Sequence, residues 1–433
     1  MAVSSTSSGS LKTGVCLSTD RPDNPYNGQV IYETDTNRTL IYDNSAWVVI
    51  SDPSLLSYSG TGATVTADAM TVAGENVTPY TGRRNLLYNG AMQVAQRGTS
   101  SAGITSAGYY TADRWRIERT SLGTWTQSVE NDAPTGSGFS KSLKMLCTTA
   151  DASPAANDFL SFRQTLEGQD LQHIRKGTSA AKQLTVSFWV KSNVTGTYTL
   201  ELIDADNTRY VSASYSIDAS ATWEKKTITF PADTTGVLDN DNQGSLRLSF
   251  WLGVGTGFSS GTLSTSWTPL SNPDRAVGQT NLAAATNNYW QITGVQLEVG
   301  DKATPFEHRS YGEELALCQR YYWRIRGDEG DYTGFLNGSA TGTTSPAVRR
   351  AIMPNPVKMR AKPTLAISAN VNVQYGTGNG LYYAITSLGY NSSNQMVTST
   401  DINGATSITA GQATHVLVNA LGATDWFEAS AEL

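Results

Sequence analysis

Several residue types that usually carry chemistry are scarce in this chain of 433 residues. Its three cysteines, Cys16, Cys147 and Cys318, lie far apart, which excludes a disulfide framework and a CxxC metal knuckle. Free thiols fit folding in a reducing cytoplasm, and the chain starts without the basic and apolar run of a signal peptide. The three histidines have no second histidine or carboxylate at ligand spacing, so neither a zinc site nor a histidine-based triad is supported.

The chain also lacks an excess of positive charge and long apolar runs. The net charge is −6, the pI is about 5.2, and no Lys or Arg follows Lys362. A nucleic-acid-binding protein needs a basic stripe that neutralises phosphates, so we expect no nucleic-acid partner. No apolar window approaches the length of a membrane span, and we expect no membrane insertion.

What remains is a chain rich in small and aromatic residues. Gly, Ser, Thr, Asn and Ala dominate, only 16% of the residues are charged, and there are 20 Tyr and 10 Trp. This profile is typical of short strands joined by small-residue turns, and the length corresponds to about three domains. We therefore predict an all-β fold.

Residues 1–53 carry the pattern of a small β-meander, with three short strands separated by turn residues. The strands are expected at residues 29–33, 39–43 and 46–50. Three short strands bury too little surface to be stable alone, so this segment is expected to trimerise or to dock on a larger assembly. Residues 54–82, mostly Thr, Ala, Gly and Val, are predicted to be an extended connector.

Strict alternation of apolar and polar residues marks the centre of the chain. In residues 184–191 the even-numbered positions are apolar, which leaves Trp189 on the polar side. In residues 246–252 the same phasing leaves Trp251 on the polar side. Further strands are predicted at residues 198–202 and 223–230. Residues 83–309 are therefore expected to form a two-sheet sandwich of jelly-roll type.

The segment behind the sandwich begins with a helix signal. Ser310 and Glu313 have the spacing of a capping box, so we expect a linking helix over residues 310–325. Residues 326–433 hold strand-like segments separated by turns, and we predict a C-terminal β-sandwich there. The alternating residues 426–433 are predicted to form a strand that pairs inside a sheet.

Two short segments frame the predicted sandwich. They are NLLYNG at 85–90, and GVQLEVG at 294–300 followed by TPFE at 304–307. Together they resemble the carbohydrate-binding-module-like domain that recurs in bacteriophage tail and fibre proteins. The runs IYETDT and IYDNSAW near the N-terminus, and SYGEELALCQRYY after the sandwich, resemble segments of the same virion proteins.

This resemblance implies a phage virion structural protein, a tail-fibre or spike-like component that assembles as a homotrimer and contributes to host attachment. It further implies that the N-terminal segment contacts other virion proteins, that a host surface glycan is a ligand, and that the protein resides in the phage particle. We expect binding rather than catalysis. Two alternatives stay open, namely a capsid-bound head fibre or tail adaptor with a purely architectural role, and a glycan-degrading spike.

Trp189 and Trp251 are the residues best suited to recognition. An indole ring offers a flat apolar face on which a sugar can stack, and it also serves as an anchor at a subunit interface. Both uses remain open, and the subunit interface is favoured because interfaces are enriched in aromatic residues. Trp115 and Trp223 are predicted to lie in the core.

Asp239 and Asp241 are the candidate metal ligands. The run DNDNQG that contains them resembles the start of a calcium loop, but position twelve of that loop is Phe250 instead of glutamate. A structural calcium is therefore the one cofactor for which the sequence offers candidate ligands.

The remaining candidates for catalysis are weak. Asp204 and Asp206 form a second acid pair, but Asp and Asn in such loops are ordinary turn formers. The match to G-x-S-x-G at 257–261 lacks the preceding strand and following helix that a nucleophile elbow needs. We predict no catalytic residue.

Overall fold

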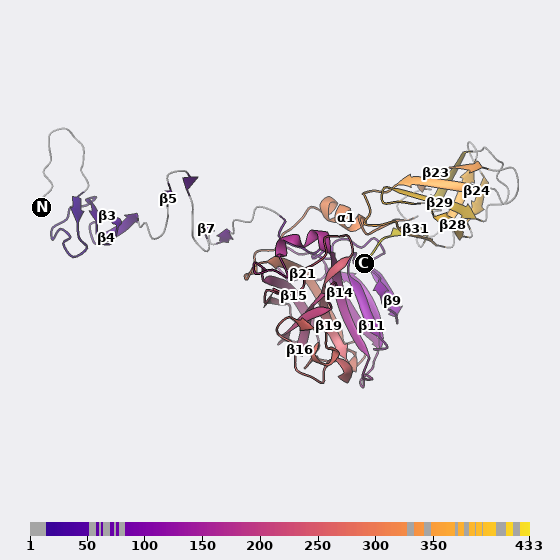
Figure 1. Cartoon of the computed structure of the whole chain (residues 1–433), viewed down its shortest axis with the longest axis horizontal. Coiled ribbons are helices and arrows are strands. Elements are labelled where there is room, and N and C mark those ends of the chain that lie inside the picture. Colours follow the sequence, from indigo (N-terminus) through magenta and orange to yellow (C-terminus); the bar gives the residue numbers. More distant parts are fainter. Residues whose placement is uncertain are drawn as a thin grey trace. The chain divides into compact units, whose positions relative to one another are not determined.

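The computed structural model describes residues 14–51, 58–59, 62–63, 70–72, 75–77, 83–326, 333–341, 348–368, 371–375, 381–385, 387–391, 393–403, 413–418 and 425–433. The chain divides into two compact units, Met1–Thr81 and Gly82–Leu433. Strands dominate the described residues, which contain a single α-helix (Figure 1). The predicted all-β class is confirmed. Within the described ranges, no helix is long and apolar enough to cross a membrane.

The first unit contains a four-stranded sheet in the order β1-β2-β3-β4. Its strands are β1 (Gly14–Cys16), β2 (Val30–Glu33), β3 (Arg38–Tyr42) and β4 (Trp47–Ser51). The last three form the predicted meander, and Asn37 and Asn44 adopt positive φ values of 61° and 79° in its turns. Strand β1, which the sequence pattern did not indicate, adds to β2 in parallel.

This sheet encloses little core. Ile31 and Leu40 are its buried apolar side chains, each 1% exposed. Several other apolar side chains of the unit are exposed to solvent: Val15, Leu17, Val48, Val49 and Ile50. The sheet therefore presents apolar surface of a kind that partners often cover.

Two short hairpins are described in the segment that follows. They pair β5 (Tyr58–Ser59) with β6 (Gly62–Ala63) and β7 (Met70–Val72) with β8 (Glu75–Val77). The rest of the predicted connector at 54–82 lies outside the described residues.

The second unit begins with two antiparallel sheets that form the sandwich (Figure 1). The seven-stranded sheet has the order β10 (Gly108–Tyr109), β11 (Arg116–Thr120), β14 (Phe159–Glu167), β19 (Gly244–Val254), β16 (Gly196–Asp204), β17 (Arg209–Ile217) and β20 (Thr268–Pro269). The six-stranded sheet has the order β18 (Glu224–Phe230), β15 (Leu184–Ser192), β21 (Tyr289–Val299), β13 (Ser142–Thr149), β12 (Thr124–Glu130) and β9 (Ser100–Ile104). The four strands predicted from alternation are present as β15, β16, β18 and β19.

The core lies between these sheets, because each strand turns its alternate apolar side chains inward. Phe188 of the six-stranded sheet meets Phe250 of the seven-stranded sheet edge-on, with ring centroids 5.0 Å apart. Trp115 stacks on Phe162 at 4.8 Å and is fully buried, so its predicted place in the core is confirmed.

The two segments that frame the sandwich in the sequence meet in space. The side chain of Asn85 donates to the carbonyl of Val295 and accepts from the N–H of Leu297, both at 3.1 Å. The Glu307 carboxylate accepts from the N–H of Asn85 at 2.5 Å, and Gln296 Oε1 accepts from the N–H of Glu307 at 2.8 Å. We call these the closing contacts. They explain the framing motif as a structural element that joins the start of the module to its last strand.

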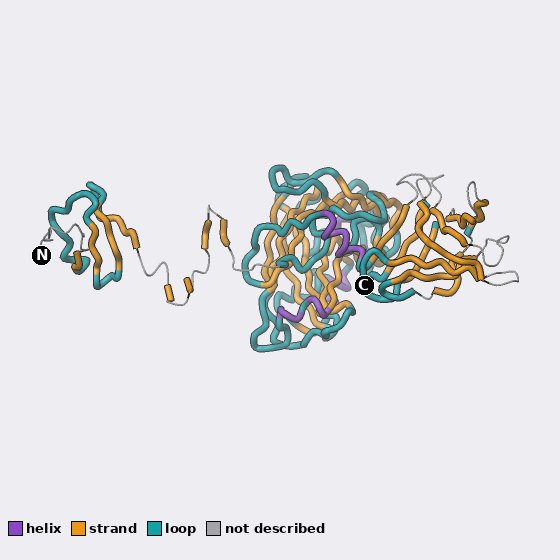
Figure 2. The backbone as a smooth tube through the Cα atoms, turned by 90° about the horizontal axis from the view of Figure 1, so that it is seen from above, coloured by secondary structure: helices purple, strands orange, loops and turns teal. Residues whose placement is uncertain are grey.

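Helical structure is sparse (Figure 2). The single-turn 3-10 helices are η1 (Gly168–Asp170), η2 (Gln172–Ile174), η3 (Thr256–Phe258), η4 (Asn272–Asp274) and η5 (Leu282–Ala284). The α-helix, α1 (Tyr311–Gln319), starts at the predicted capping box, where Ser310 and Glu313 bond to each other's backbone N–H. The predicted helix was too long, because β22 (Tyr322–Arg326) follows at once and pairs with a strand near the chain end.

Two further sheets complete the second unit. The three-stranded sheet has the order β22, β31 (Trp426–Ser430) and β25 (Thr364–Ile367), so the strand predicted at 426–433 is present and lies in the centre. The seven-stranded one has the order β27 (Leu381–Ala384), β26 (Val371–Tyr375), β30 (Ala413–Val418), β23 (Thr333–Thr341), β24 (Val348–Pro354), β29 (Val397–Asn403) and β28 (Ser387–Asn391).

Ionic contacts connect residues that flank the three-stranded sheet to the sandwich. The guanidinium of Arg114, which is fully buried, pairs with Glu432, and Arg320 pairs with Glu167 at 2.7 Å. Asp113 is buried in the same region, 3.9 Å from Arg97. Burial raises the pKa of Asp113 to about 6, although Arg97 works in the opposite direction.

Candidate functional site

The outer face of the six-stranded sheet carries the first predicted recognition residue. Trp189 lies on β15, opposite Lys225 of β18 and Thr293 of β21. Its ring is half-buried, whereas its neighbours Phe188 and Val190 point into the core and are fully buried. The predicted phasing of Trp189 is therefore correct.

Trp223 lies on the same face, and its predicted place in the core is wrong. It precedes Lys225 by two residues, so the alternation of β18 turns both side chains to the side of Trp189. The ring is half-buried, and the ammonium of Lys191 lies 5.0 Å from its centroid. The indole N–H donates to Asp132 Oδ1 at 3.2 Å. The alternation of residues 223–230, already visible in the sequence, could have shown this.

Asp132, in the loop between β12 and β13, connects the polar groups of this area. Its carboxylate pairs with Lys191 and accepts from the amide of Gln291 at 3.2 Å. Desolvation opposes its charge, but the hydrogen bonds from Lys191, Trp223 and Gln291 outweigh it and lower the pKa of Asp132. We call Asp132, Trp189, Lys191, Trp223 and Gln291 the tryptophan patch. It places a carboxylate, an ammonium and an amide beside two indole rings.

A second aromatic group joins Phe139, in the loop that carries Asp132, to Phe306 and His308 of the segment after β21. The ring of Phe139 meets Phe306 edge-on at 4.9 Å and lies 5.2 Å from His308. It covers Gly294 so closely that a Cβ there would be 2.6 Å from Phe139 Cζ. Gly294 also has a φ of +62°, so both its backbone and its contact require glycine. Phe139 therefore covers β21 of the six-stranded sheet at Gly294.

No family model matches this chain. No curated protein matches it either.

Several solved structures are similar to about half of the chain. One is the enzymatically active domain of tailspike protein 4 from bacteriophage CBA120, with 13% identity and a TM-score of 0.27; the match covers 50% of this chain but only 21% of that one. Another is TmCBM61 in complex with β-1,4-galactotriose, with 10% identity, a TM-score of 0.27, and coverage of 50% and 99%. A third is the CBM22-1 xylan-binding domain of Paenibacillus barcinonensis Xyn10C, with 12% identity, a TM-score of 0.25, and coverage of 52% and 100%.

Trp251 is not exposed, contrary to the sequence prediction. It lies on the outer face of the seven-stranded sheet as its phasing required, but only 1% of it is accessible. The segment after β19 folds back over this face, and Phe258 and Arg275 lie 5.5 and 4.9 Å from the Trp251 ring. Arg275 in turn pairs with Glu201 at 2.7 Å, and that carboxylate is fully buried. A sugar has no access to Trp251 in this arrangement.

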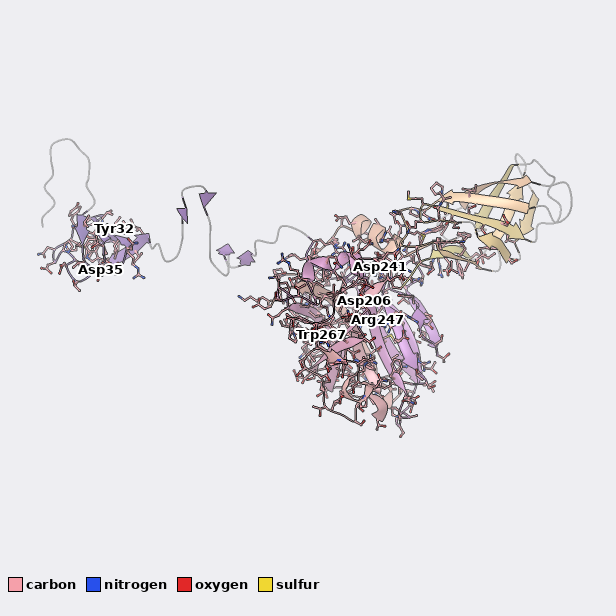
Figure 3. All side chains as sticks on the ribbon, in the orientation of Figure 1. Tyr32, Asp35, Asp206, Asp241, Arg247 and Trp267 are labelled. Carbon is pink, nitrogen blue, oxygen red and sulfur yellow. The ribbon has the colours of Figure 1, made fainter. Side chains whose placement is uncertain are left out.

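The predicted metal ligands lie in an exposed loop. Asp241 accepts from the N–H of Gln243 at 2.8 Å, which is a turn contact, and the N–H of Asp239 donates to Asp206 at 2.9 Å. Asp206 and Asp241 belong to the sandwich (Figure 3). Among the residues that the structure describes, no group of three or more His, Cys, Asp or Glu side chains could hold a metal ion. Calcium binding by Asp239 and Asp241 stays a prediction.

The other candidates for chemistry have structural partners. The carboxylate of Asp204 is fully buried and pairs with the ammonium of Lys176. Ser259 of the G-x-S-x-G match follows η3 and donates to the carbonyl of Gly255 at 3.1 Å. The strand and helix of a nucleophile elbow do not flank it.

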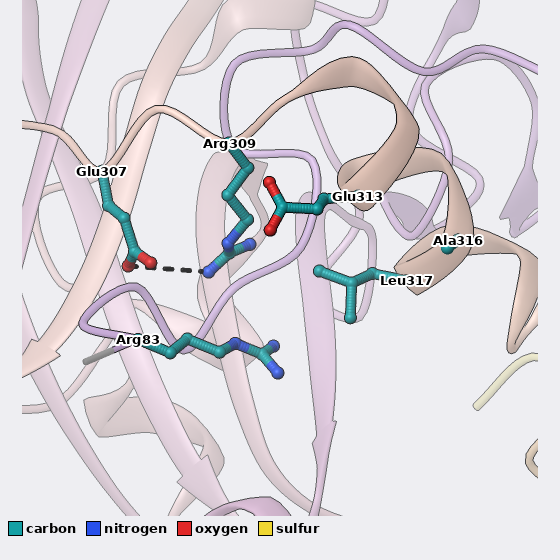
Figure 4. A pocket seen from close by; sticks show the side chains of 6 residues that line it. All are labelled: Arg83, Glu307, Arg309, Glu313, Ala316 and Leu317. Atoms are coloured by element: carbon teal, nitrogen blue, oxygen red, sulfur yellow. Dashed lines mark ion pairs between the residues drawn. The ribbon is translucent and has the colours of Figure 1, made fainter.

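A hollow of about 530 Å³ lies between the closing contacts and α1 (Figure 4). Its lining residues are Arg83, Glu307, Arg309, Glu313, Ala316 and Leu317. Most of the charged groups are already engaged, because Arg309 pairs with Glu307 at 3.7 Å and bonds to backbone carbonyls, while Glu313 caps α1. The charged side chains of this hollow thus hold the ends of the module and the start of α1 in place. We therefore keep the tryptophan patch as the candidate site.

Proposed function

We propose that this chain is a structural protein of a phage virion, a tail-fibre or spike-like component whose sandwich binds a surface glycan of the host. The glycan would bind at the tryptophan patch. The observation that carries this assignment is the pair of partly exposed indoles, Trp189 and Trp223, beside the carboxylate of Asp132, whose side chain is 47% exposed. Sugar rings offer apolar C–H faces for stacking and hydroxyl groups that need both donors and acceptors.

The first unit would mediate the assembly of the protein. Its exposed apolar side chains on and near β4 and β1 support a role as the contact surface of a homotrimer or of another virion protein. The protein would then reside in the phage particle and act by binding, without catalysis. Light scattering on the purified chain should give three times the mass of one chain, and a monomer at working concentration would contradict the trimer.

A glycan array with matched variants tests the binding site. We expect Trp189→Ala and Trp223→Ala to lose the glycan signal, and Asp132→Asn to weaken it. Tyr311→Ala, which removes an aromatic ring that is 60% exposed on α1, should bind as the wild type does. Glycan binding that survives both tryptophan substitutions would remove the patch from consideration. New reducing ends after incubation with host polysaccharide would contradict the absence of catalysis.

The architectural alternative rests on the same exposed apolar residues of the first unit. A capsid-bound head fibre or tail adaptor would need this surface but not the tryptophan patch. A trimer that binds virion proteins but shows no affinity for host cells or their glycans would support this second function.

A further inference from the structure

Three arginines gather on the outer face of the seven-stranded sheet. Arg116 of β11 lies directly opposite Arg163 of β14 in the ladder. Arg163 lies opposite Ser249 of β19, and Arg247 comes two residues before Ser249 on the same side of that strand. Figure 3 labels Arg247 on the sandwich. The three guanidinium groups therefore belong to neighbouring positions on three adjacent strands, β11, β14 and β19.

The positive charge of this arginine cluster is only partly balanced. Glu118 is the one carboxylate that pairs with it among the described residues, at 3.3 Å from Arg116 and 2.8 Å from Arg163. No ion pair of Arg247 occurs within the described part of the chain. The buried Nε atoms of Arg163 and Arg247 have no hydrogen-bond partner there either. Like charges placed opposite each other destabilise a sheet. The cluster therefore does not serve the stability of the fold, which points to a functional role.

Elsewhere on the same face, a buried charge is neutralised within the protein. There, the buried Glu201 carboxylate receives a two-pronged contact from Arg275, at 2.7 and 2.9 Å, and the charges cancel. The arginine cluster, by contrast, forms ion pairs with one carboxylate, Glu118, among the described residues, and the Glu201 carboxylate, on which Arg163 also acts, is already paired with Arg275. Desolvation lowers the pKa of Arg163 to about 10, and the neighbouring Arg247 and Arg116 add to this against the effect of Glu118. An anion that bound here would relieve this repulsion.

We propose that Arg116, Arg163 and Arg247 form an anion-binding site that receives the carboxylate or phosphate group of an acidic saccharide. Guanidinium groups bind such oxyanions through paired N–H donors. The cluster spans two spacings between strands, roughly 10 Å, which fits one or two sugar units. The inference rests on the proposed glycan-binding function and adds a second site on the opposite sheet, selective for charged sugars.

A nucleic acid would be the other polyanionic ligand, and the cluster does not favour it. The chain has a net charge of −6, and three arginines within roughly 10 Å do not make the extended basic stripe that follows a phosphate backbone. The anionic saccharide is therefore the ligand class that we assign.

Affinity electrophoresis of the full chain tests this site. The gels contain alginate as the carboxylate polymer, a phosphorylated mannan as the phosphate polymer, or dextran as the neutral control. We expect at least one acidic polymer to retard the wild type, and Arg247→Gln to weaken that binding about tenfold. Lys302→Gln removes one exposed positive charge outside the cluster and should bind as the wild type does. The polymer that retards the chain decides between carboxylate and phosphate.

Three outcomes of the binding experiment would overturn the proposal. They are no retardation of the wild type by either acidic polymer, equal retardation of the wild type and Arg247→Gln, and stronger Arg247-dependent binding to a single-stranded oligonucleotide than to both polymers. Because Arg247→Gln removes repulsion, its melting temperature should equal or exceed that of the wild type. A clear drop in melting temperature would instead assign a structural role. Neutral-glycan binding that depends on Trp189 tests the proposed function separately, because Arg247→Gln should leave it unchanged.

Discussion

The substitution Gly294→Ala tests whether Phe139 covers the outer face of β21. A left-handed backbone at +62° costs an alanine roughly 1–2 kcal/mol. The new Cβ would lie 2.6 Å from Phe139 Cζ, so the ring must move and lose its edge-on contact with Phe306. Such an aromatic pair contributes about 0.5–1.5 kcal/mol. We therefore expect the free energy of unfolding to fall by roughly 2–3 kcal/mol.

Gly278 offers a matched control. Its φ is +82°, and a Cβ there would meet nothing within 4 Å, so Gly278→Ala carries the backbone strain alone. Both substitutions change the unfolded chain in the same way. Urea unfolding, followed by tryptophan fluorescence, should show a larger loss for Gly294→Ala, and the excess should vanish in a Phe139→Ala background. Equal losses for the two variants in the wild-type background would refute the placement of Phe139 over Gly294.

Three further predictions concern buried charges and the closing contacts. Arg275→Met should lower the free energy of unfolding by roughly 3–5 kcal/mol, because it leaves the buried Glu201 carboxylate unpaired. Denaturant titrations of the double variant Arg275→Met, Glu201→Gln should show that most of the lost stability returns. The pKa of Asp113 is raised to about 6 in the folded chain, so its proton stabilises the fold below about pH 4, and that stability is lost as the pH rises through 6. Relative to Asp113→Asn, the wild type should lose roughly 2–2.5 kcal/mol between pH 4 and 7.5; parallel pH profiles would contradict this. Glu307→Ala should cost roughly 2–3 kcal/mol in thermal or urea unfolding, since its carboxylate accepts from backbone N–H groups, and an unchanged stability would show that the closing contacts are not stabilising.

Local patterns in the sequence predicted the local structure well. The period-two alternation predicted the direction of Trp189, because side-chain direction in a strand depends only on position along it. The capping box at Ser310 located the start of α1, because its two hydrogen bonds join residues three apart. Features of this kind are determined within a few residues.

The candidate site depended on contacts that no local pattern contains. Trp251 has the same phasing as Trp189, but a segment that follows β19 covers it, and alternation cannot show what lies above a sheet. Asp132 reaches Trp223 from a loop 91 residues earlier in the chain. The strand pairing that brings Arg116 opposite Arg163 likewise follows from topology. The sequence therefore predicted which sheet face a side chain points to, but not which other segments pack over that face.

The closing contacts also bring the two ends of the module together. Glu307 accepts hydrogen bonds from the N–H groups of both Arg84 and Asn85, and Arg309 donates to the carbonyl of Asn85. The chain thus enters and leaves the sandwich at one point. If the chain were pulled at residues 84 and 309, the tension would pass through these few bonds, and the two sheets would lie beside the path of the force. A module whose two ends meet can be inserted between two other segments with little change in the course of the chain.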